Sequence, residues 1–190
     1  MSDFNAEVKK TLDVLKKKGI ILYPTDTIWG IGCDATCAEA VSRISQLKNR
    51  GSEKSFILLL DEGGRLPSYI KEVPETAWPL IEYSTRPLTI IYDGAKNLPP
   101  EVIAEDGSVA IRITNDEFCK RLIGGLRKPI LSTSANISGK PWPAAYDEID
   151  PEIINGVDYV VNWRQNEKSP VQPSTILRLK TGGEIKFIRP

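Results

Sequence analysis

The stretch LSTSANISG, residues Leu131–Gly139, places a run of short polar side chains directly after an apolar strand. Hydroxyl, amide and glycine residues at the end of a buried strand make a poor core and suit a loop that holds an anion or another polar ligand. Ser132, Ser134 and Asn136 alternate, so a continued strand pleat directs all three into one small volume. A turn-rich strand end explains the same pattern, and the stretch alone slightly favours that simpler interpretation.

Helices and strands alternate on both sides of this stretch. Apolar residues at helical spacing predict helices at 5–18, 38–47, 75–83 and 116–123, and a weaker one near 151–155. Apolar runs bounded by turn residues predict strands at 20–23, 56–60, 88–92, 108–113, 130–134, 159–161, 174–179 and 184–188, with a hairpin turn at 181–183. The pattern predicts one α/β domain over residues 1–190, with a twisted mixed sheet of parallel and antiparallel strands flanked by helices.

The composition is that of an ordinary soluble protein, with 41% hydrophobic and 26% charged residues among 190. Basic and acidic residues number 25 each, which argues against a general nucleic-acid binder and leaves a local basic patch open. The sequence shows neither a signal peptide nor a membrane span. We therefore expect a cytoplasmic protein without a membrane partner.

The chain contains no histidine. This excludes Ser-His-Asp and Cys-His catalysis, histidine metal sites and imidazole as a general base. The three cysteines, Cys33, Cys37 and Cys119, include no Cys-x-x-Cys pair, which favours reduced thiols over a disulfide framework or a zinc ribbon. Any chemistry must rely on other groups.

Two further stretches and one strand residue favour a ligand site. Residues 24–34 form a strand-to-loop passage rich in hydrogen-bonding side chains, for which a wide turn is the alternative. Lys48, Arg50 and Lys54 lie between a predicted helix and a strand; such runs are usually solvated, but this placement suits a polyphosphate. Arg112, the one cation in an apolar strand, either snorkels at an edge or meets an anionic ligand.

Neither a P-loop nor a Rossmann fingerprint is present. An ordered set of motifs nevertheless resembles the YrdC-like threonylcarbamoyl-AMP synthases over nearly the whole chain: Tyr23–Thr27 with Gly30–Gly32, Lys48 with Arg50, Pro87–Thr89, Val109–Arg112, Ser132–Gly139 and Pro173–Thr175. The resemblance implies that L-threonine, bicarbonate or CO₂ and ATP give threonylcarbamoyl-AMP and pyrophosphate. The product would serve N6-threonylcarbamoylation of adenosine 37 in tRNA (t6A) through a downstream transfer complex.

In that reaction the substrates supply the nucleophiles, so the resemblance implies no catalytic nucleophile; Lys48 and Arg50 are the first candidates for charge stabilisation. It implies threonine binding at Thr27, Arg112, Ser132 and Ser174, with Arg112 suited to the carboxylate. It implies ATP binding at Lys48, Arg50, Lys54, Ser108, Ser134, Asn136, Trp142 and Arg189. The implied cofactor, Mg²⁺, would be held through ATP phosphates and water, with Asp26 the nearest carboxylate.

The sequence departs from the family pattern in three places. Ser84–Pro87 replaces the usual Pro-Gly-Pro and adds Arg86 near the expected pocket mouth. Leu59 stands where longer relatives often carry a histidine. The additional C-terminal domain of the longer branch is not expected, so a lid would come from Gln165–Pro173.

Two other functions remain open at this stage. The first is a module of the same fold that binds double-stranded RNA or tRNA without turnover. The second is a small-molecule-binding domain that has lost turnover.

Overall fold

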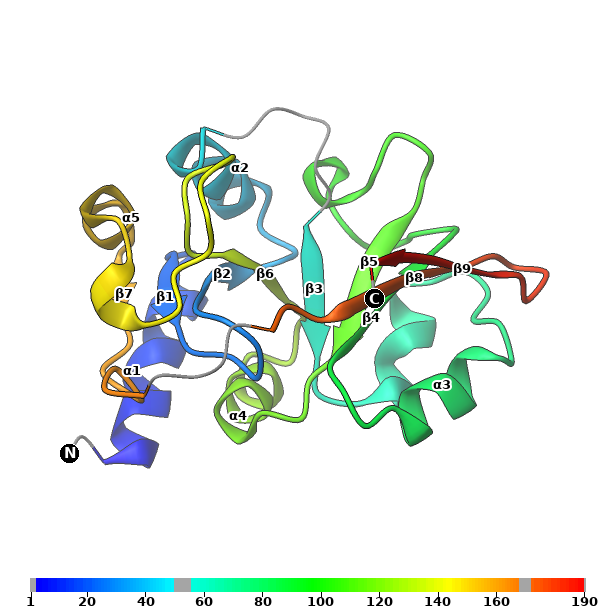
Figure 1. Cartoon of the computed structure of the whole chain (residues 1–190), viewed down its shortest axis with the longest axis horizontal. Helices are drawn as coiled ribbons and strands as arrows, with labels where there is room; N and C mark the ends of the chain where they lie inside the picture. The colour runs from blue at the N-terminus through cyan, green and yellow to red at the C-terminus, as the bar shows by residue number, and fades with distance from the viewer. Residues whose placement is uncertain (1–2, 50–55, 168–171, 190) are drawn as a thin grey trace.

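A mixed sheet organises the computed structural model, which describes residues 3–49, 56–167 and 172–189. The strands are β1 Ile21–Tyr23, β2 Gly30–Asp34, β3 Ile57–Leu60, β4 Leu88–Tyr92, β5 Val109–Ile113, β6 Ile130–Ser134, β7 Tyr159–Val160, β8 Thr175–Leu179 and β9 Ile185–Arg189. Within the described ranges these nine strands form one sheet in the order β7-β1-β2-β6-β3-β5-β4-β8-β9 (Figure 1). Three neighbouring pairs, β1–β7, β3–β5 and β4–β8, are parallel and the others antiparallel, which confirms the predicted mixed sheet.

Five α-helices accompany the sheet in the described residues: α1 Phe4–Lys16, α2 Ala38–Leu47, α3 Ala77–Tyr83, α4 Glu117–Leu126 and α5 Pro151–Gly156. Short 3₁₀ helices lie at Gly63–Ser68, Pro100–Val102 and Tyr146–Glu148. Asp3 caps α1 by accepting from the amide of Asn5, and Asp116 caps α4 by accepting from the amide of Cys119. None of the described helices is both long and apolar enough to cross a membrane.

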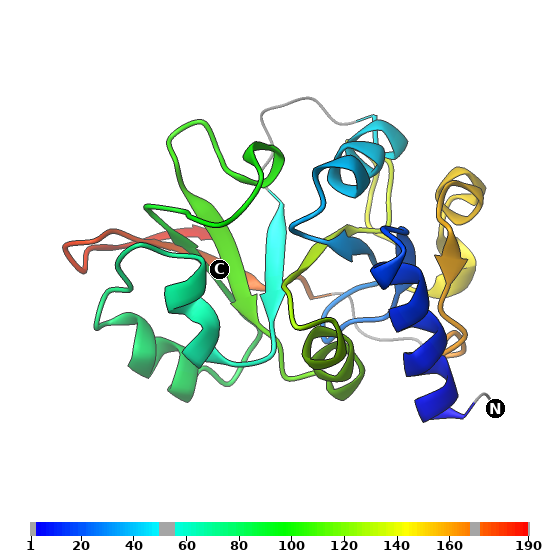
Figure 2. The same cartoon turned by 180° about the vertical axis from the view of Figure 1, so that it is seen from behind.

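The helices cover the two faces of the sheet through two separate apolar clusters. Val8 of α1 and Phe118 of α4 pack against Tyr23, Leu59 and Ile130 on one face. Figure 2 shows α1 and α4 next to one another. The larger cluster on the opposite face joins the apolar side of α2 to the remaining core residues of the strands.

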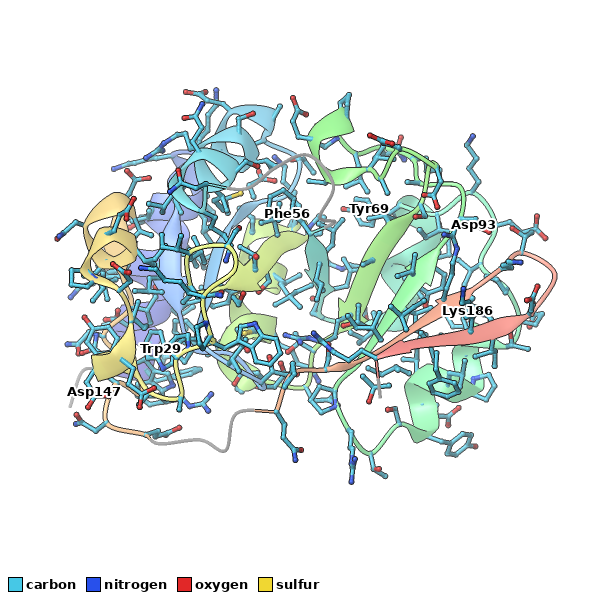
Figure 3. All side chains as sticks on the ribbon, turned by 45° about the horizontal axis from the view of Figure 1, so that its top comes forward. Trp29, Phe56, Tyr69, Asp93, Asp147 and Lys186 are labelled. Atoms are coloured by element: carbon cyan, nitrogen blue, oxygen red, sulfur yellow. The ribbon has the colours of Figure 1, made fainter. Side chains whose placement is uncertain are left out.

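Side chains fill the fold on both faces (Figure 3). Trp29 is buried, and its ring lies 5.2 Å from that of Tyr146. This ring contact joins the loop before β2 to the 3₁₀ helix before α5 and thereby braces one side of the molecule.

The cover that α4 gives to its face of the sheet ends partway along β3 and β6. Leu59 of β3 and Ile130 of β6 are buried in the α1–α4 cluster. Two residues away on the same face, Ile57, at the edge of that cluster, and Ser132 line a cavity. Side chains of β5 in register with Ile57 extend the same uncovered area. We call this the pocket face.

One local prediction was wrong. Residues 24–34 were expected to remain a strand-to-loop passage, but Gly30–Asp34 forms β2, a central strand paired with both β1 and β6. The sequence did not indicate this strand because Gly30 and Gly32 have low β-strand propensity.

Candidate active site

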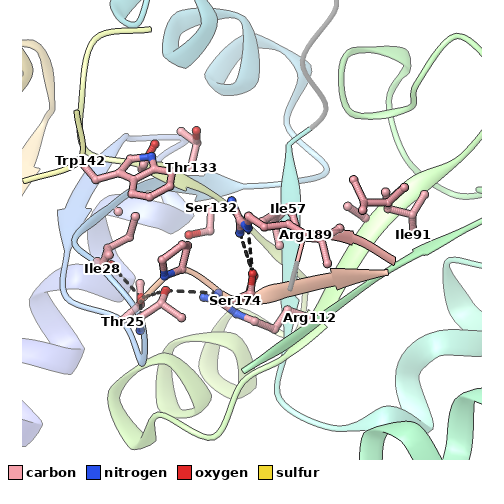
Figure 4. Close-up of a pocket in the computed structure, with 17 residues that line it drawn as sticks. Thr25, Ile28, Ile57, Ile91, Arg112, Ser132, Thr133, Trp142, Ser174 and Arg189 are labelled. Atoms are coloured by element: carbon pink, nitrogen blue, oxygen red, sulfur yellow. Dashed lines mark hydrogen bonds between the residues drawn. The ribbon is translucent and has the colours of Figure 1, made fainter. Parts of the chain in front are cut away.

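A cavity of about 260 Å³ opens on the pocket face between β6, β3, β5 and β4 (Figure 4). We call it the inner chamber, and its polar walls come from Thr25, Thr27, Arg112, Ser132, Thr133, Ser134, Ser174 and Arg189. Apolar walls come from Ile28, Ile57, Ile91, Ala110, Ile176 and Ile188. This mixture, a few converging polar groups in an apolar cavity, is typical of a small-molecule site.

A second cavity of about 760 Å³ adjoins the first and is called the outer chamber. The two share Thr133, Ser134, Trp142 and Arg189, so they form one continuous depression. The outer chamber adds Lys48, Asn136, Ser138, Gly139, Lys140 and Pro141, which lie at the end of α2 and in the loop after β6. Figure 1 shows that loop running beside α2.

Arg112 is the buried cation of the inner chamber, with 4% of its side chain exposed. Its Nη2 lies 3.1 Å from Oδ1 of Asp26, and its Nη1 donates to Oγ1 of Thr27 at 3.3 Å. The Nε is buried, and no described residue accepts a hydrogen bond from it. A buried charge that retains donor capacity suits an anionic ligand, because the ligand completes its hydrogen bonding.

Arg189, from the edge strand β9, reaches across the inner chamber to Ser174. Its Nε and Nη2 donate to the carbonyl oxygen of Ser174 at 3.0 and 2.8 Å. Burial, with the like charge of Arg112, lowers the pKa of Arg189, which still stays protonated at neutral pH. Its guanidinium carbon also lies 5.9 Å from the ring centre of Trp142, so the two form a boundary between the chambers.

Ser174 is held from its other side by a buried hydroxyl pair. Its Oγ lies 2.7 Å from Oγ1 of Thr89 on β4. Both residues are buried, so this contact fixes the start of β8 against β4. The site therefore depends on a pairing between segments far apart in the sequence.

Lys48 is 3% exposed and organises the loop after β6. Its Nζ donates to the carbonyl oxygens of Ser134 and Asn136, the latter at 2.7 Å, and to Oδ1 of Asn136 at 3.3 Å. The backbone of Lys48 also contacts this loop, because the amide of Ser138 donates to the carbonyl oxygen of Lys48 at 3.1 Å. Lys48 thus brings positive charge to the outer chamber and shapes its wall.

Gly30 makes the floor of the inner chamber accessible. A Cβ at this position would lie 3.1 Å from Oγ of Ser132 and 3.3 Å from the carbonyl oxygen of Thr133. Either contact is tighter than ordinary van der Waals distance, so any larger residue would press into the polar floor.

The structure brings together most of the residues that the sequence singled out. Thr27, Arg112, Ser132 and Ser174 all line the inner chamber. Ser134, Trp142 and Arg189 line both chambers, and Lys48 and Asn136 line the outer one. The predicted alternation holds for Ser132 and Ser134, but Asn136 follows the end of β6 and faces the outer chamber alone.

Other predicted residues lie elsewhere. Ser108 is not among the residues that line either chamber, and its hydroxyl donates to Asp106 at 2.6 Å. Arg86 was expected near the pocket mouth, but it lines a cavity on the opposite face. Arg50 and Lys54 lie outside the described residues, as do residues 168–171 of the predicted lid.

Sequence reasoning missed the apolar half of the site. Ile57, Ala110 and Ile91 belong to apolar strand runs and gave no signal, because only the sheet register shows which residues escape cover by α4. Pro173, at the end of the predicted lid, proved to be a wall residue.

Asp26 was the nearest carboxylate for a metal ion, but its Oδ1 faces Arg112 and its Oδ2 accepts from Thr114 at 3.2 Å. In the described part of the chain, no three or more cysteine or carboxylate side chains gather closely enough to hold a metal. The described side chains therefore do not form a dedicated coordination site for Mg²⁺.

Two of the three cysteine thiols have no role in these chambers. Cys33 and Cys119 are buried, and burial raises the pKa of both thiols. Neither lines a chamber. Because the thiolate is the nucleophilic form, both are unreactive at neutral pH.

Fold and site together define a class of mixed-sheet α/β proteins in which a small, cation-containing chamber opens into a larger basic one. The family model Sua5/YciO/YrdC, described as telomere recombination, matches residues 13–190. The chain belongs to this family.

Individual members of the family are similar to this chain over most of its length. A threonylcarbamoyl-AMP synthase of Pseudoalteromonas translucida is 31% identical over 185 residues, covering 93% of this chain and 94% of the relative. The crystal structure of P. abyssi Sua5 complexed with L-threonine has a TM-score of 0.87 at 25% identity and covers 96% of this chain. This chain spans 53% of that Sua5 chain. E. coli YciO, at 21% identity and a TM-score of 0.84 with 100% and 90% coverage, shares the fold.

Proposed function

We propose that the protein is an L-threonylcarbamoyladenylate synthase, a nucleotidyltransferase that makes threonylcarbamoyl-AMP and pyrophosphate from L-threonine, bicarbonate or CO₂ and ATP. The observation that carries this proposal is the adjacency of the two chambers. An amino-acid-sized cavity with a buried guanidinium opens, through shared residues, into a larger basic cavity of nucleotide size. Relatives over nearly the full chain length carry the same activity in their names.

Threonine is assigned to the inner chamber. Its carboxylate would accept charge-assisted hydrogen bonds from Arg112, and its hydroxyl and amine would face Thr27, Ser132 and Ser174. The apolar walls around Ile57 exclude water from the reacting amine. The related P. abyssi Sua5 structure is a complex with L-threonine, which supports threonine as the substrate.

ATP is assigned to the outer chamber. Lys48, Asn136 and Lys140 bring positive charge and polar groups to one side, and Trp142 and Arg189 offer a flat surface at the boundary between the chambers. The α-phosphate would lie at the shared residues Thr133 and Ser134, next to the inner chamber. Arg50, Lys54 and Ser108 remain predicted ATP ligands.

The chemistry needs no protein nucleophile. The neutral threonine amine attacks the carbon of CO₂ to form a carbamate, with release of a proton from the nitrogen to solvent, or it attacks the carbon of bicarbonate with loss of water. A carbamate oxygen then attacks the α-phosphorus of ATP, a P–O bond forms, and the bond to pyrophosphate breaks. The residues align the reactants and offset charge on the phosphates, as in phosphoryl transfer generally.

Mg²⁺ would bind through the phosphates of ATP and supply further charge neutralisation there. The product would pass to the transfer complex that modifies tRNA, in the cytoplasm. A double-stranded RNA or tRNA module without turnover is the alternative, and balanced charge argues against it.

Pyrophosphate release by the purified protein tests the proposal. We expect release from ATP and Mg²⁺ that requires both L-threonine and bicarbonate, together with a product of the mass of threonylcarbamoyl-AMP. Release that is indifferent to threonine would refute the substrate assignment, and no release alongside salt-sensitive tRNA binding would favour the alternative.

A further inference from the structure

We propose that Asp26 is a positioning residue: it holds the Arg112 guanidinium from outside the inner chamber and thereby sets the preference for an amino-acid carboxylate. The inference deepens the proposed function and rests on it. The sequence analysis names Asp26 only as the nearest carboxylate for Mg²⁺ and not as a partner of Arg112.

The contacts form a chain of three buried or nearly buried side chains. Oδ1 of Asp26 lies 3.1 Å from Nη2 of Arg112, with 15% and 4% of the two side chains exposed. Oδ2 of Asp26 accepts from Oγ1 of Thr114 at 3.2 Å, and Thr114 is buried. The hydroxyl of Thr114 is itself fixed, because it accepts from the amide of Asp116 at 3.2 Å. The orientation of the carboxylate is therefore set by the backbone that follows β5.

Asp26 does not line the inner chamber. It lines a separate cavity of about 420 Å³ whose walls include Ile111 and Ile113, the β5 residues that point away from the pocket face. A ligand in the inner chamber would thus meet Arg112 and not Asp26. The Asp26 side chain therefore acts on the ligand indirectly, and its ion pair with Arg112 connects it to a wall residue of the chamber.

Charge gives this arrangement a function beyond packing. Arg112 and Arg189 both line the inner chamber, and the like charge of Arg112 contributes to the lowered pKa of Arg189. Without Asp26, the two guanidiniums would repel each other and Arg112 would turn toward solvent or another acceptor. With Asp26 in place, Arg112 keeps one fixed orientation and its remaining donors stay available for a carboxylate.

A simpler interpretation is that the pair only stabilises the fold. The chain offers a control for it, the more exposed ion pair between Asp93 and Arg178, with 2.6 Å between Oδ1 and Nη2; Arg178 also pairs with Asp106 at 2.7 Å. Neither residue lines a chamber. Asp93 follows β4 on the side of the molecule that carries the β8–β9 hairpin, well away from Trp29 (Figure 3).

The experiment compares Asp26→Asn with Asp93→Asn in pyrophosphate release, since both changes remove one charge and keep the side-chain shape. For Asp26→Asn we expect the KM for L-threonine to rise about tenfold, as when a charge-assisted interaction is lost, with kcat and the KM for ATP within about twofold. Inhibition by L-threoninol, which lacks the carboxylate, should be unchanged. Asp93→Asn should leave kcat, both KM values and the inhibition by L-threoninol at wild-type values.

Equal threonine KM values in the two variants would overturn the inference, as would a parallel loss of L-threoninol inhibition. If Asp26→Asn does not fold, Thr114→Val decides instead: a smaller rise in the threonine KM, about threefold, is expected, and no rise overturns the inference. A wild-type protein without threonine-dependent release refutes the proposed function itself, which separates the two failures.

Discussion

The inner and outer chambers are neighbours built in different ways. The inner chamber is made by the loop before β2, by β2 to β6, by the start of β8 and by the end of β9, and its buried cation Arg112 is held by a carboxylate and a hydroxyl. The outer chamber is made by the end of α2 and the loop after β6, where Lys140 pairs with Asp150 at the surface and Trp142 is 43% exposed. Strands fix side-chain positions more closely than loops do.

The difference suggests a division of labour. A small substrate that must be distinguished from close analogues gains from the rigid, desolvated inner chamber, where each polar group is expensive to leave unpaired. A nucleotide with several negative charges tolerates a more open, adaptable chamber. The following substitutions should therefore have steep, threonine-specific effects in the inner chamber and shallow effects in the outer one.

Arg112→Gln should have the largest effect. Loss of the guanidinium leaves Asp26 without its cation, which typically destabilises a protein by about 3–5 kcal/mol for a buried pair. We expect kcat/KM for L-threonine to fall by about 100-fold, the sum of a lost carboxylate contact and a disordered chamber. Arg178→Gln is the control, and equal losses in the two variants would place the threonine site elsewhere.

Gly30→Ala should come next. The added methyl group meets Ser132 and the backbone of Thr133, and overpacking of this kind costs about 1–3 kcal/mol. We expect a threonine KM about tenfold higher with little change in the KM for ATP. Gly64→Ala, where the methyl group meets nothing within 4 Å, should be silent. A larger effect on ATP than on threonine would reverse the assignment of the chambers.

Trp142→Ala should have a moderate effect that falls mainly on the nucleotide. It removes the ring beside Arg189 and part of the wall shared by the chambers, and we expect the KM for ATP to rise about threefold. The thermal unfolding midpoint should stay near that of the wild type because the ring is partly exposed. Steady-state kinetics with ATP varied at saturating threonine measures this; an unchanged ATP KM removes Trp142 from the site.

Lys140→Gln should have the smallest effect. The Asp150 carboxylate raises the pKa of the Lys140 ammonium, so the group is charged at every working pH, but it is exposed. Exposed pairs contribute little, so we expect less than a twofold change in the KM for ATP at physiological salt. A larger change would show that the outer chamber closes around ATP more tightly than this structure does.

Sequence reasoning succeeded where local pattern decides structure. The strands β4 and β6 and the helix α2 were predicted with their observed bounds, because apolar runs and helical spacing mark them directly. The hydroxyl-rich end of β6 also predicted the polar floor of the site. The ordered motifs then pointed to the family that the comparisons confirm.

The same reasoning failed where register or distant pairing decides. β2 was missed because Gly30 and Gly32 weaken strand signals, although they are what allows β2 to lie against β6. The contact of Asp26 with Arg112 joins residues 86 positions apart, and no local pattern reveals such a pair. Arg86 was misplaced for a related reason, since alternation along β4 turns its neighbours to the opposite face.

A crystal structure with L-threonine and a non-hydrolysable ATP analogue would test the two-chamber assignment most directly. We predict the threonine carboxylate within hydrogen-bond distance of Arg112 in the inner chamber, with the triphosphate in the outer chamber beside Thr133 and Ser134. Threonine bound outside the inner chamber, or phosphates in contact with Arg112, would contradict the assignment.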